Sequence, residues 1–117
     1  MVRVRGGDTL TGFTINEMLE MQTLLREKYE DKWGSFSPSL GSDQLLWMVG
    51  EVGEVIDIVK KHGNENACEN EALREKLIEE LVDVLMYFND VLLCYGVSEE
   101  DLKQSYISKF EYNMKRW

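Results

Sequence analysis

The stretch LLWMVGEVGEVIDIV, residues 45–59, contains Glu51 and Glu54 three positions apart in an otherwise apolar segment. A later apolar stretch, IEELVDV, carries Glu80 and Asp83 at the same spacing. A helix turns about 100° per residue, so side chains three apart lie on the same face. Both stretches therefore predict helices that place a pair of carboxylates beside an apolar surface.

Two carboxylate pairs in such surroundings need a physical reason. Unpaired buried charges are costly, and four neighbouring carboxylates raise one another's pKa values. If the two helices pack antiparallel, the pairs meet at a similar height, and a cation is needed to keep them ionised. Oxygen-only ligation is the preference of Mg²⁺ or Mn²⁺. Di-iron bundles instead use Glu-x-x-His, and the only histidine, His62, is not three residues from any of these acids. The spacing predicts a divalent-metal site for a phosphorylated substrate; a solvated charged face is the plain alternative for the second pair.

Length and composition limit the class of protein. The chain has 117 residues, 44% hydrophobic and 30% charged, which suits one globular domain. A net charge of −9 argues against binding nucleic acid polymers, whose affinity comes from Lys and Arg. The sequence contains no run of about 18 apolar residues, the length that a membrane span needs. The basic N-terminus lacks the apolar region of a signal peptide. Cys68 and Cys94 match no metal-binding spacing, so we expect a reduced, cytoplasmic protein.

Helical periodicity and capping residues predict an all-α fold, and no segment shows a convincing alternating pattern of a strand. Thr14, Asn70 and Ser98 are the expected N-caps, and residues 1–13 are expected to form a flexible or extended arm before a single domain, 14–117. The first predicted helix covers 15–32, and the second runs from a cap at Ser42 or Asp43 to about Lys61. The third covers 71–95, and the fourth runs from 99 to near 117. The polar stretch GNENACEN is predicted to form a turn between the second and third helices. Four helices with short connections predict a four-helix bundle.

The motifs resemble the signature of the MazG-like, all-α nucleoside triphosphate pyrophosphohydrolases, in which ExxE is followed by ExxD after a gap of about 25 residues. VGEVGEVIDI is similar to the helix motif of the branch that includes dCTP pyrophosphatases. EELVDVLMY with YGVSEEDL resembles the ELADVL…LGI…L pattern of that family, and KFEYNMKRW resembles its closing K-x-x-x-N-x-x-R segment. The resemblance covers roughly residues 43–117 and implies an oligomeric four-helix bundle.

The resemblance implies an enzyme that hydrolyses an NTP or dNTP to the monophosphate and pyrophosphate, by attack of water at the α-phosphorus. By matching position, Glu51, Glu54, Glu80 and Asp83 would ligate Mg²⁺, for which Mn²⁺ is a possible substitute. One glutamate could be the general base rather than a ligand, with Glu54 preferred and Glu51 also in a catalytic position.

Further positions match the substrate contacts of the family: Tyr87, Lys109, Asn113 and Arg116. The resemblance implies that Tyr87 faces the nucleotide and that the other three contact phosphates, across a subunit interface in a homodimer or homotetramer. Where the dCTP branch often has tryptophan, this chain has Lys61, which is either a solvated helix end that suits the dipole or a phosphate contact. The aromatic wall for the base would come from Trp33 or Trp47, although a tryptophan in a loop can also be a packing anchor.

Two alternatives share these residues. One is a phosphoribosyl-ATP pyrophosphohydrolase-like enzyme, which would have the same architecture and differ in its substrate. The other is a non-catalytic acidic helical module that binds a partner. That module would show no metal dependence and would tolerate the loss of Glu54.

Overall fold

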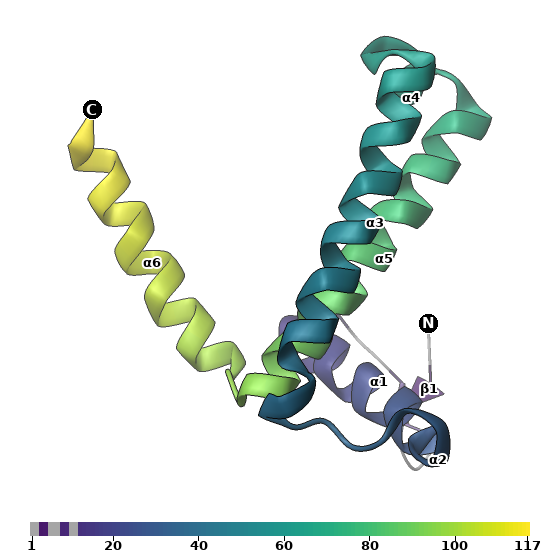
Figure 1. The fold of residues 1–117 in the computed structure, drawn as a ribbon. Helices are drawn as coiled ribbons and strands as arrows, with labels where there is room; N and C mark the ends of the chain where they lie inside the picture. Colours follow the sequence, from purple (N-terminus) through teal and green to yellow (C-terminus); the bar gives the residue numbers. More distant parts are fainter. Residues whose placement is uncertain (1–2, 5–7, 10–11) are drawn as a thin grey trace.

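The computed structural model describes residues 3–4, 8–9 and 12–117, and these are almost entirely helical (Figure 1). The all-α class is therefore confirmed. The structure describes the predicted N-terminal arm only in part. Within it, β1 and β2 form a short antiparallel pair, and residues 1–2, 5–7 and 10–11 lie outside the described residues. In chain order the elements are β1 (Arg3–Val4), β2 (Asp8–Thr9), α1 (Ile15–Lys28), α2 (Glu30–Trp33), the 3₁₀ helix η1 (Pro38–Leu40), α3 (Gly41–His62), α4 (Asn64–Glu69), α5 (Glu71–Tyr95) and α6 (Glu99–Arg116).

The predicted caps of three helices are confirmed. The side-chain oxygens of Thr14, Asn70 and Ser98 each accept a hydrogen bond of 3.1 Å from the backbone N–H three residues ahead. Gly96 ends α5 in the left-handed conformation, with φ at 65°, which glycine adopts without steric cost. These local signals fix where α1, α5 and α6 begin and where α5 ends.

Three local predictions are wrong. The first helix breaks at Tyr29, so that α1 ends at Lys28 and α2 follows as a separate short helix. The stretch GNENACEN is not a turn, because most of it forms α4, whose Ala67 is buried against the main helices. Neither Ser42 nor Asp43 caps α3, which continues directly from η1 without a side-chain cap.

The start of α3 depends on a glycine. Gly41 is buried, and a Cβ atom placed on it would lie 2.2 Å from the ring of Tyr95 at the end of α5. Only a residue without a side chain lets the two helices approach this closely. The contact joins the first residue of α3 to the last residue of α5.

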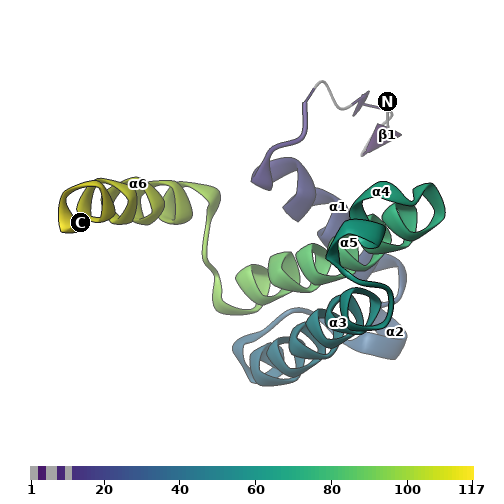
Figure 2. The same cartoon turned by 90° about the horizontal axis from the view of Figure 1, so that it is seen from above.

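The centre of the fold is the antiparallel pair α3 and α5, which pack along their length (Figure 1). Helix α4 covers one end of this pair, and α1 packs against α5 near the other end. Helix α6 instead projects away from the pair, as Figures 1 and 2 show from two directions. Near its start, the backbone N–H of Asn16 donates a hydrogen bond of 3.2 Å to Oε1 of Glu99. Within one chain, α6 does not pack along the other helices as the fourth member of a bundle.

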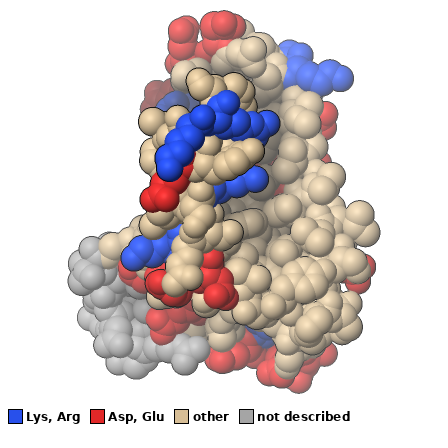
Figure 3. Space-filling view, turned by 90° about the vertical axis from the view of Figure 1, so that its left-hand side faces the viewer, with Lys and Arg blue, Asp and Glu red and all other residues tan. Residues whose placement is uncertain are grey.

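This arrangement leaves much apolar surface uncovered. Among the described residues, the buried apolar side chains are those of Ile58, Ala67, Leu92 and Cys94. The apolar surface beside Glu51 and Glu54 is largely solvent-exposed on α3, where Val49 is 62% exposed. Seen from the side of α6, the surface includes a broad area without charged residues (Figure 3). The exposed large apolar side chains of α6 are Tyr106, Ile107, Phe110, Tyr112 and Met114, followed by Trp117 at its C-cap.

In the described part of the chain, no single helix is long and apolar enough to cross a membrane. One pair, α5 and α6, would qualify by combined length and composition, but it is bent by 109°.

Candidate functional site

Three of the four predicted acids come together between α3 and α5. Glu51 of α3 and Glu80 and Asp83 of α5 each offer a carboxylate oxygen, and these oxygens lie within 4.8 Å of one another. All three side chains are partly buried. Two oxygens on opposite sides of a Mg²⁺ ion are about 4.2 Å apart, twice the usual bond length. Only one pair among three oxygens can lie on opposite sides of an ion, so each of these side chains would have to move inward by up to about 0.7 Å for all three to bind a single ion. We call this group the carboxylate cluster.

The electrostatics of the carboxylate cluster favour a cation. Burial raises the pKa of Glu51 above its ordinary value, and the negative charges of Asp83 and Glu80 raise it further. A side-chain hydrogen bond with Glu80 and the charge of Glu54 act in the same direction. The Nζ atom of Lys76 lies 3.8 Å from Oε1 of Glu80, but the lysine side chain is 61% exposed, so its charge is well screened. A bound divalent ion would remove this repulsion.

Glu54 differs from the other three acids. It is exposed and is not part of the carboxylate cluster, although its charge acts on Glu51. Whether it ligates a metal or acts as a base stays a prediction. Its position one turn beyond Glu51 leaves its carboxylate facing solvent beside the cluster.

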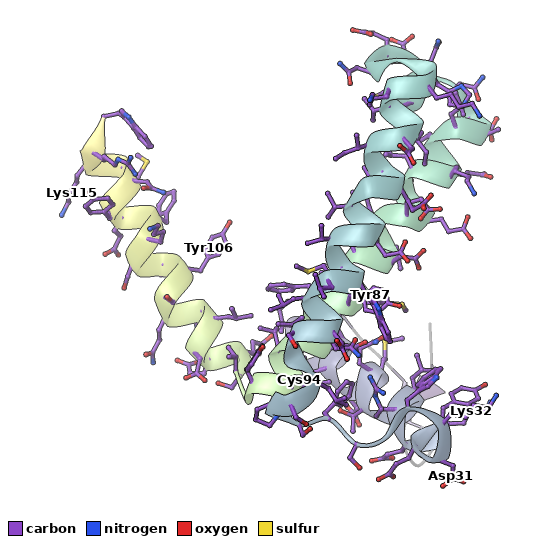
Figure 4. All side chains as sticks on the ribbon, in the orientation of Figure 1. Asp31, Lys32, Tyr87, Cys94, Tyr106 and Lys115 are labelled. Carbon is purple, nitrogen blue, oxygen red and sulfur yellow. The ribbon has the colours of Figure 1, made fainter. Side chains whose placement is uncertain are left out.

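A cavity of about 440 Å³ adjoins the cluster between α1, α2, α3 and α5. Asp83 belongs to the carboxylate cluster and also lines the cavity. Tyr87, one turn further along α5, lines the cavity as well (Figure 4). The rings of Trp47 and Tyr87 meet edge to face with centroids 6.1 Å apart, and Trp33 also lines the cavity. The two tryptophans and the tyrosine singled out from the sequence thus lie around one space, whose volume is typical of a small-molecule site.

Polar side chains that sequence reasoning did not single out line the same cavity. Nε2 of Gln22 on α1 donates a buried hydrogen bond of 2.8 Å to Oδ1 of Asp90 on α5. Arg26, four residues after Gln22, donates to the backbone oxygen of Trp33 and lies over its ring at 5.4 Å. Gln44 of α3 is 3% exposed, and its Oε1 atom has no hydrogen-bond partner. The i, i+4 spacing of Gln22 and Arg26 was a usable signal, because it places both on one face of α1.

Two cavity groups have perturbed pKa values. Burial raises the pKa of Tyr87, and the charges of Glu51, Asp90 and Asp83 raise it further, so the hydroxyl keeps its proton and can donate a hydrogen bond. Burial also raises the pKa of Asp90, while the hydrogen bond from Gln22 and the charge of Arg26 oppose that rise. Asp90 is 8% exposed, so its carboxyl group is largely removed from water.

The remaining predicted contacts lie elsewhere in the chain. Lys61 is exposed near the end of α3, about 15 Å along the helix from Glu51 at the usual rise per residue. Lys109 and Arg116 line a shallow surface hollow on α6. Figure 1 shows that α6 projects away from α3 and α5, the helices that carry the carboxylate cluster. Asn113, also on α6, has a buried Oδ1 atom without a hydrogen-bond partner. The resemblance implies that Lys109, Asn113 and Arg116 act across a subunit interface, so the roles of all four residues toward phosphate stay predictions.

No protein-family model, no curated protein and no solved structure matches this chain. The resemblance to MazG-like pyrophosphohydrolases therefore stays a prediction.

Proposed function

We propose that this protein is a Mg²⁺-dependent nucleoside triphosphate pyrophosphohydrolase. The observation that carries the proposal is the carboxylate cluster beside an aromatic-lined cavity, with Asp83 common to both. A nucleoside triphosphate has a flat base that suits the cavity and a charged tail that needs a cation. The cavity and the cluster are adjacent, as the two ends of one such ligand require.

The donor set of the cluster fits Mg²⁺, with Mn²⁺ as a substitute, because it contains carboxylate oxygens and neither histidine nor cysteine. Glu51, Glu80 and Asp83 would hold the ion, and Glu54 would join them or act on water. When bound, Mg²⁺ neutralises phosphate oxygens and so favours nucleophilic attack at phosphorus.

The residues of the chain then have distinct tasks. Tyr87 and the tryptophans hold the nucleoside, and the Tyr87 hydroxyl donates a hydrogen bond toward the phosphates. Water attacks the α-phosphorus, and the bond from that phosphorus to the oxygen bridging to the β-phosphate breaks. Pyrophosphate leaves with the bridging oxygen, and Glu54, exposed beside Glu51, takes the proton of the water.

The proposal includes self-association, because the single chain is poorly closed. Its accessible surface is 8706 Å², whereas a compact monomer of 13.6 kDa exposes about 6,600 Å². Its radius of gyration is 16.7 Å, against about 13.4 Å for a compact domain of this length. The excess of about 2,100 Å² is on the scale that each partner buries in an obligate dimer. A homodimer or homotetramer would cover the apolar faces of α3 and α6 and could bring Lys109, Asn113 and Arg116 to the cluster of a second copy.

The test is hydrolysis of the eight canonical NTPs and dNTPs with Mg²⁺, with products separated by ion-exchange chromatography. Glu80→Gln removes a cluster carboxylate, and Glu79→Gln makes the same change at its exposed neighbour, outside the cluster. We expect monophosphate and pyrophosphate from the wild type and from Glu79→Gln, and a loss of at least a hundredfold in Glu80→Gln. Glu54→Gln tests the proposed base in the same assay.

Other products would change the assignment. Diphosphate plus phosphate would mean that another bond is cut. Turnover of phosphoribosyl-ATP alone would favour the histidine-pathway type of enzyme. No turnover of any of these with Mg²⁺ or Mn²⁺ would favour a non-catalytic acidic helical module.

A further inference from the structure

Arg26 is a buried cation in the last turn of α1. Its side chain is 9% exposed, and its charge acts on Asp90 of α5. Removing an arginine from water is costly unless its charge and its N–H groups find partners. Asp90 offsets the charge, and the other contacts of Arg26 lead to one short segment of the chain.

That segment, residues 30–36, follows the break between α1 and α2, and we call it the α2 wall. Two of its residues, Lys32 and Trp33, line the cavity. No side chain of α2 is buried, and Trp33 is 47% exposed, so packing against the core does little to fix this segment. Segments with few buried apolar contacts open at a low cost in free energy. The α2 wall therefore needs contacts of another kind to stay in place.

Arg26 supplies such contacts. Its Nη1 atom donates a hydrogen bond of 3.1 Å to the backbone oxygen of Trp33, one of the carbonyl groups that the end of a helix leaves without a partner. Its guanidinium carbon lies 5.4 Å from the centroid of the Trp33 ring and 4.4 Å from that of Phe36. The Trp33 ring also meets Tyr29, with centroids 4.7 Å apart. The indole that lines the cavity is thus held by Arg26 and by Tyr29.

These contacts require the planar guanidinium of arginine. A guanidinium presents its N–H donors in a rigid fork and stacks on aromatic rings, whereas the ammonium of lysine is a compact point charge. Arginine at position 26 can therefore bond to a carbonyl and contact two rings while its charge interacts with Asp90. Lysine would keep the charge and lose the fixed position of the rings.

We propose that Arg26 is a positioning residue that holds Trp33 in the wall of the cavity and acts on a bound ligand through that ring. The kinetic consequence rests on the proposed function, whereas the state of the α2 wall does not. If Trp33 is in place in only about a tenth of the molecules, the apparent Kd of a ligand is roughly tenfold higher. The chemical step should change little, because the carboxylate cluster lies on α3 and α5.

Hydrogen exchange followed by mass spectrometry tests the α2 wall without a ligand. The backbone N–H groups of residues 32–34 are hydrogen-bonded to the preceding turn. We expect their exchange to be roughly tenfold faster in Arg26→Gln and in Arg26→Lys, with the exchange of α5 unchanged. Arg74→Gln, the same change at an exposed position of α5, should leave the α2 wall as it is in the wild type.

Each of three results would overturn the inference. Exchange of the wild-type α2 wall at the rate of an unfolded chain would show that nothing holds it. Wild-type protection in Arg26→Gln or Arg26→Lys would show that the planar contacts do not matter. An equal acceleration throughout α5 would show that Arg26 supports the whole fold rather than this segment.

Steady-state kinetics separates positioning from direct contact with the ligand. For each canonical nucleotide that the wild type hydrolyses with Mg²⁺, Arg26→Gln should raise KM roughly tenfold and leave kcat within about twofold. Trp33→Ala should raise KM as well, and Arg26→Gln added to it should have little further effect, because both changes remove one contact. A further rise in KM in the double variant would mean that Arg26 touches the ligand itself, against the inference. If no nucleotide is hydrolysed, the proposed function fails, and hydrogen exchange alone decides whether Arg26 holds the α2 wall.

Discussion

Substituting Phe110 by glutamate should dissociate the oligomer that we propose. Phe110 lies on α6 and is 57% exposed in the single chain, where nothing in the structure accounts for a large aromatic side chain on a projecting helix. In Figure 4, Tyr106 extends from the same helix on the side that faces the α3–α5 pair in that view. If a second copy covers this surface, a charge at Phe110 enters an apolar interface.

The expected magnitude follows from burial. Fully burying a large apolar side chain contributes about 1.5–3 kcal/mol, and a two-fold symmetric dimer contains the substitution twice. Because Phe110 is 57% exposed in the single chain, Phe110→Glu should weaken association by about 1.7–3.4 kcal/mol before any cost of burying the charge, or roughly twentyfold to three-hundredfold in Kd. Ile56→Glu, which places a charge on the exposed apolar face of α3, should have an effect of the same order.

Sedimentation equilibrium over a range of concentrations measures the effect. The wild type should have a mass of about 27 kDa or a higher multiple of the 13.6 kDa chain, and Phe110→Glu should approach the single chain. Ala72→Glu is the matched control, because it adds the same charge at an exposed position in the first turn of α5. A wild type that is monomeric at every concentration, with full helical content by circular dichroism, would refute the argument from excess surface.

Four further expectations concern stability. The pKa of Glu51 is higher in the folded protein than its ordinary value of 4.5. At a pH above this raised pKa, the ionised Glu51 therefore lowers the stability of the fold, and this loss disappears as the pH falls through 4.5. Without Mg²⁺, Glu51→Gln should raise Tm near neutral pH, and a gain that persists at low pH would contradict this cause. Mg²⁺ at a hundred times its Kd should stabilise the wild type by about 2.7 kcal/mol and should have little effect on Glu80→Gln, as scanning fluorimetry can measure. Urea unfolding should show that Gln44→Leu is about 1–3 kcal/mol more stable than the wild type, and a loss of stability would mean that the amide is paired in the folded chain. Gly41→Ala should cost about 1–3 kcal/mol through overpacking against Tyr95, and much less when Tyr95→Ala is also present.

The sequence predicted features whose causes are local. The hydroxyls of Thr14 and Ser98 cap the N–H groups three residues ahead, and this depends on a few neighbouring residues only. The exposure of Glu54 depends instead on how α3 meets α5, and spacing along one helix does not contain that information. The predicted cap of α3 failed because a close helix contact at Gly41, rather than a capping side chain, sets its first residue.

The pairing of Gln22 with Asp90 in the wall of the cavity was beyond sequence reasoning for a similar reason. Gln22 and Asp90 are 68 residues apart, and neither has a pattern that points to the other. A buried polar pair resembles two surface residues in sequence, because polarity alone does not distinguish them. Periodicity also does not predict the position of α6. An apolar stripe predicts that one face of a helix packs against another surface, but it does not say whether that surface belongs to the same chain or to another one.

The separation of α6 from the rest of its own chain has a consequence for how the molecule folds. An isolated helix of 18 residues is only marginally stable in water, and α6 begins after the left-handed turn at Gly96 with few contacts to hold it. If its covering surface belongs to another copy, the coil-to-helix transition of this segment takes place only on encounter. The free energy of unfolding is then not a constant of the sequence but rises with the concentration of chains.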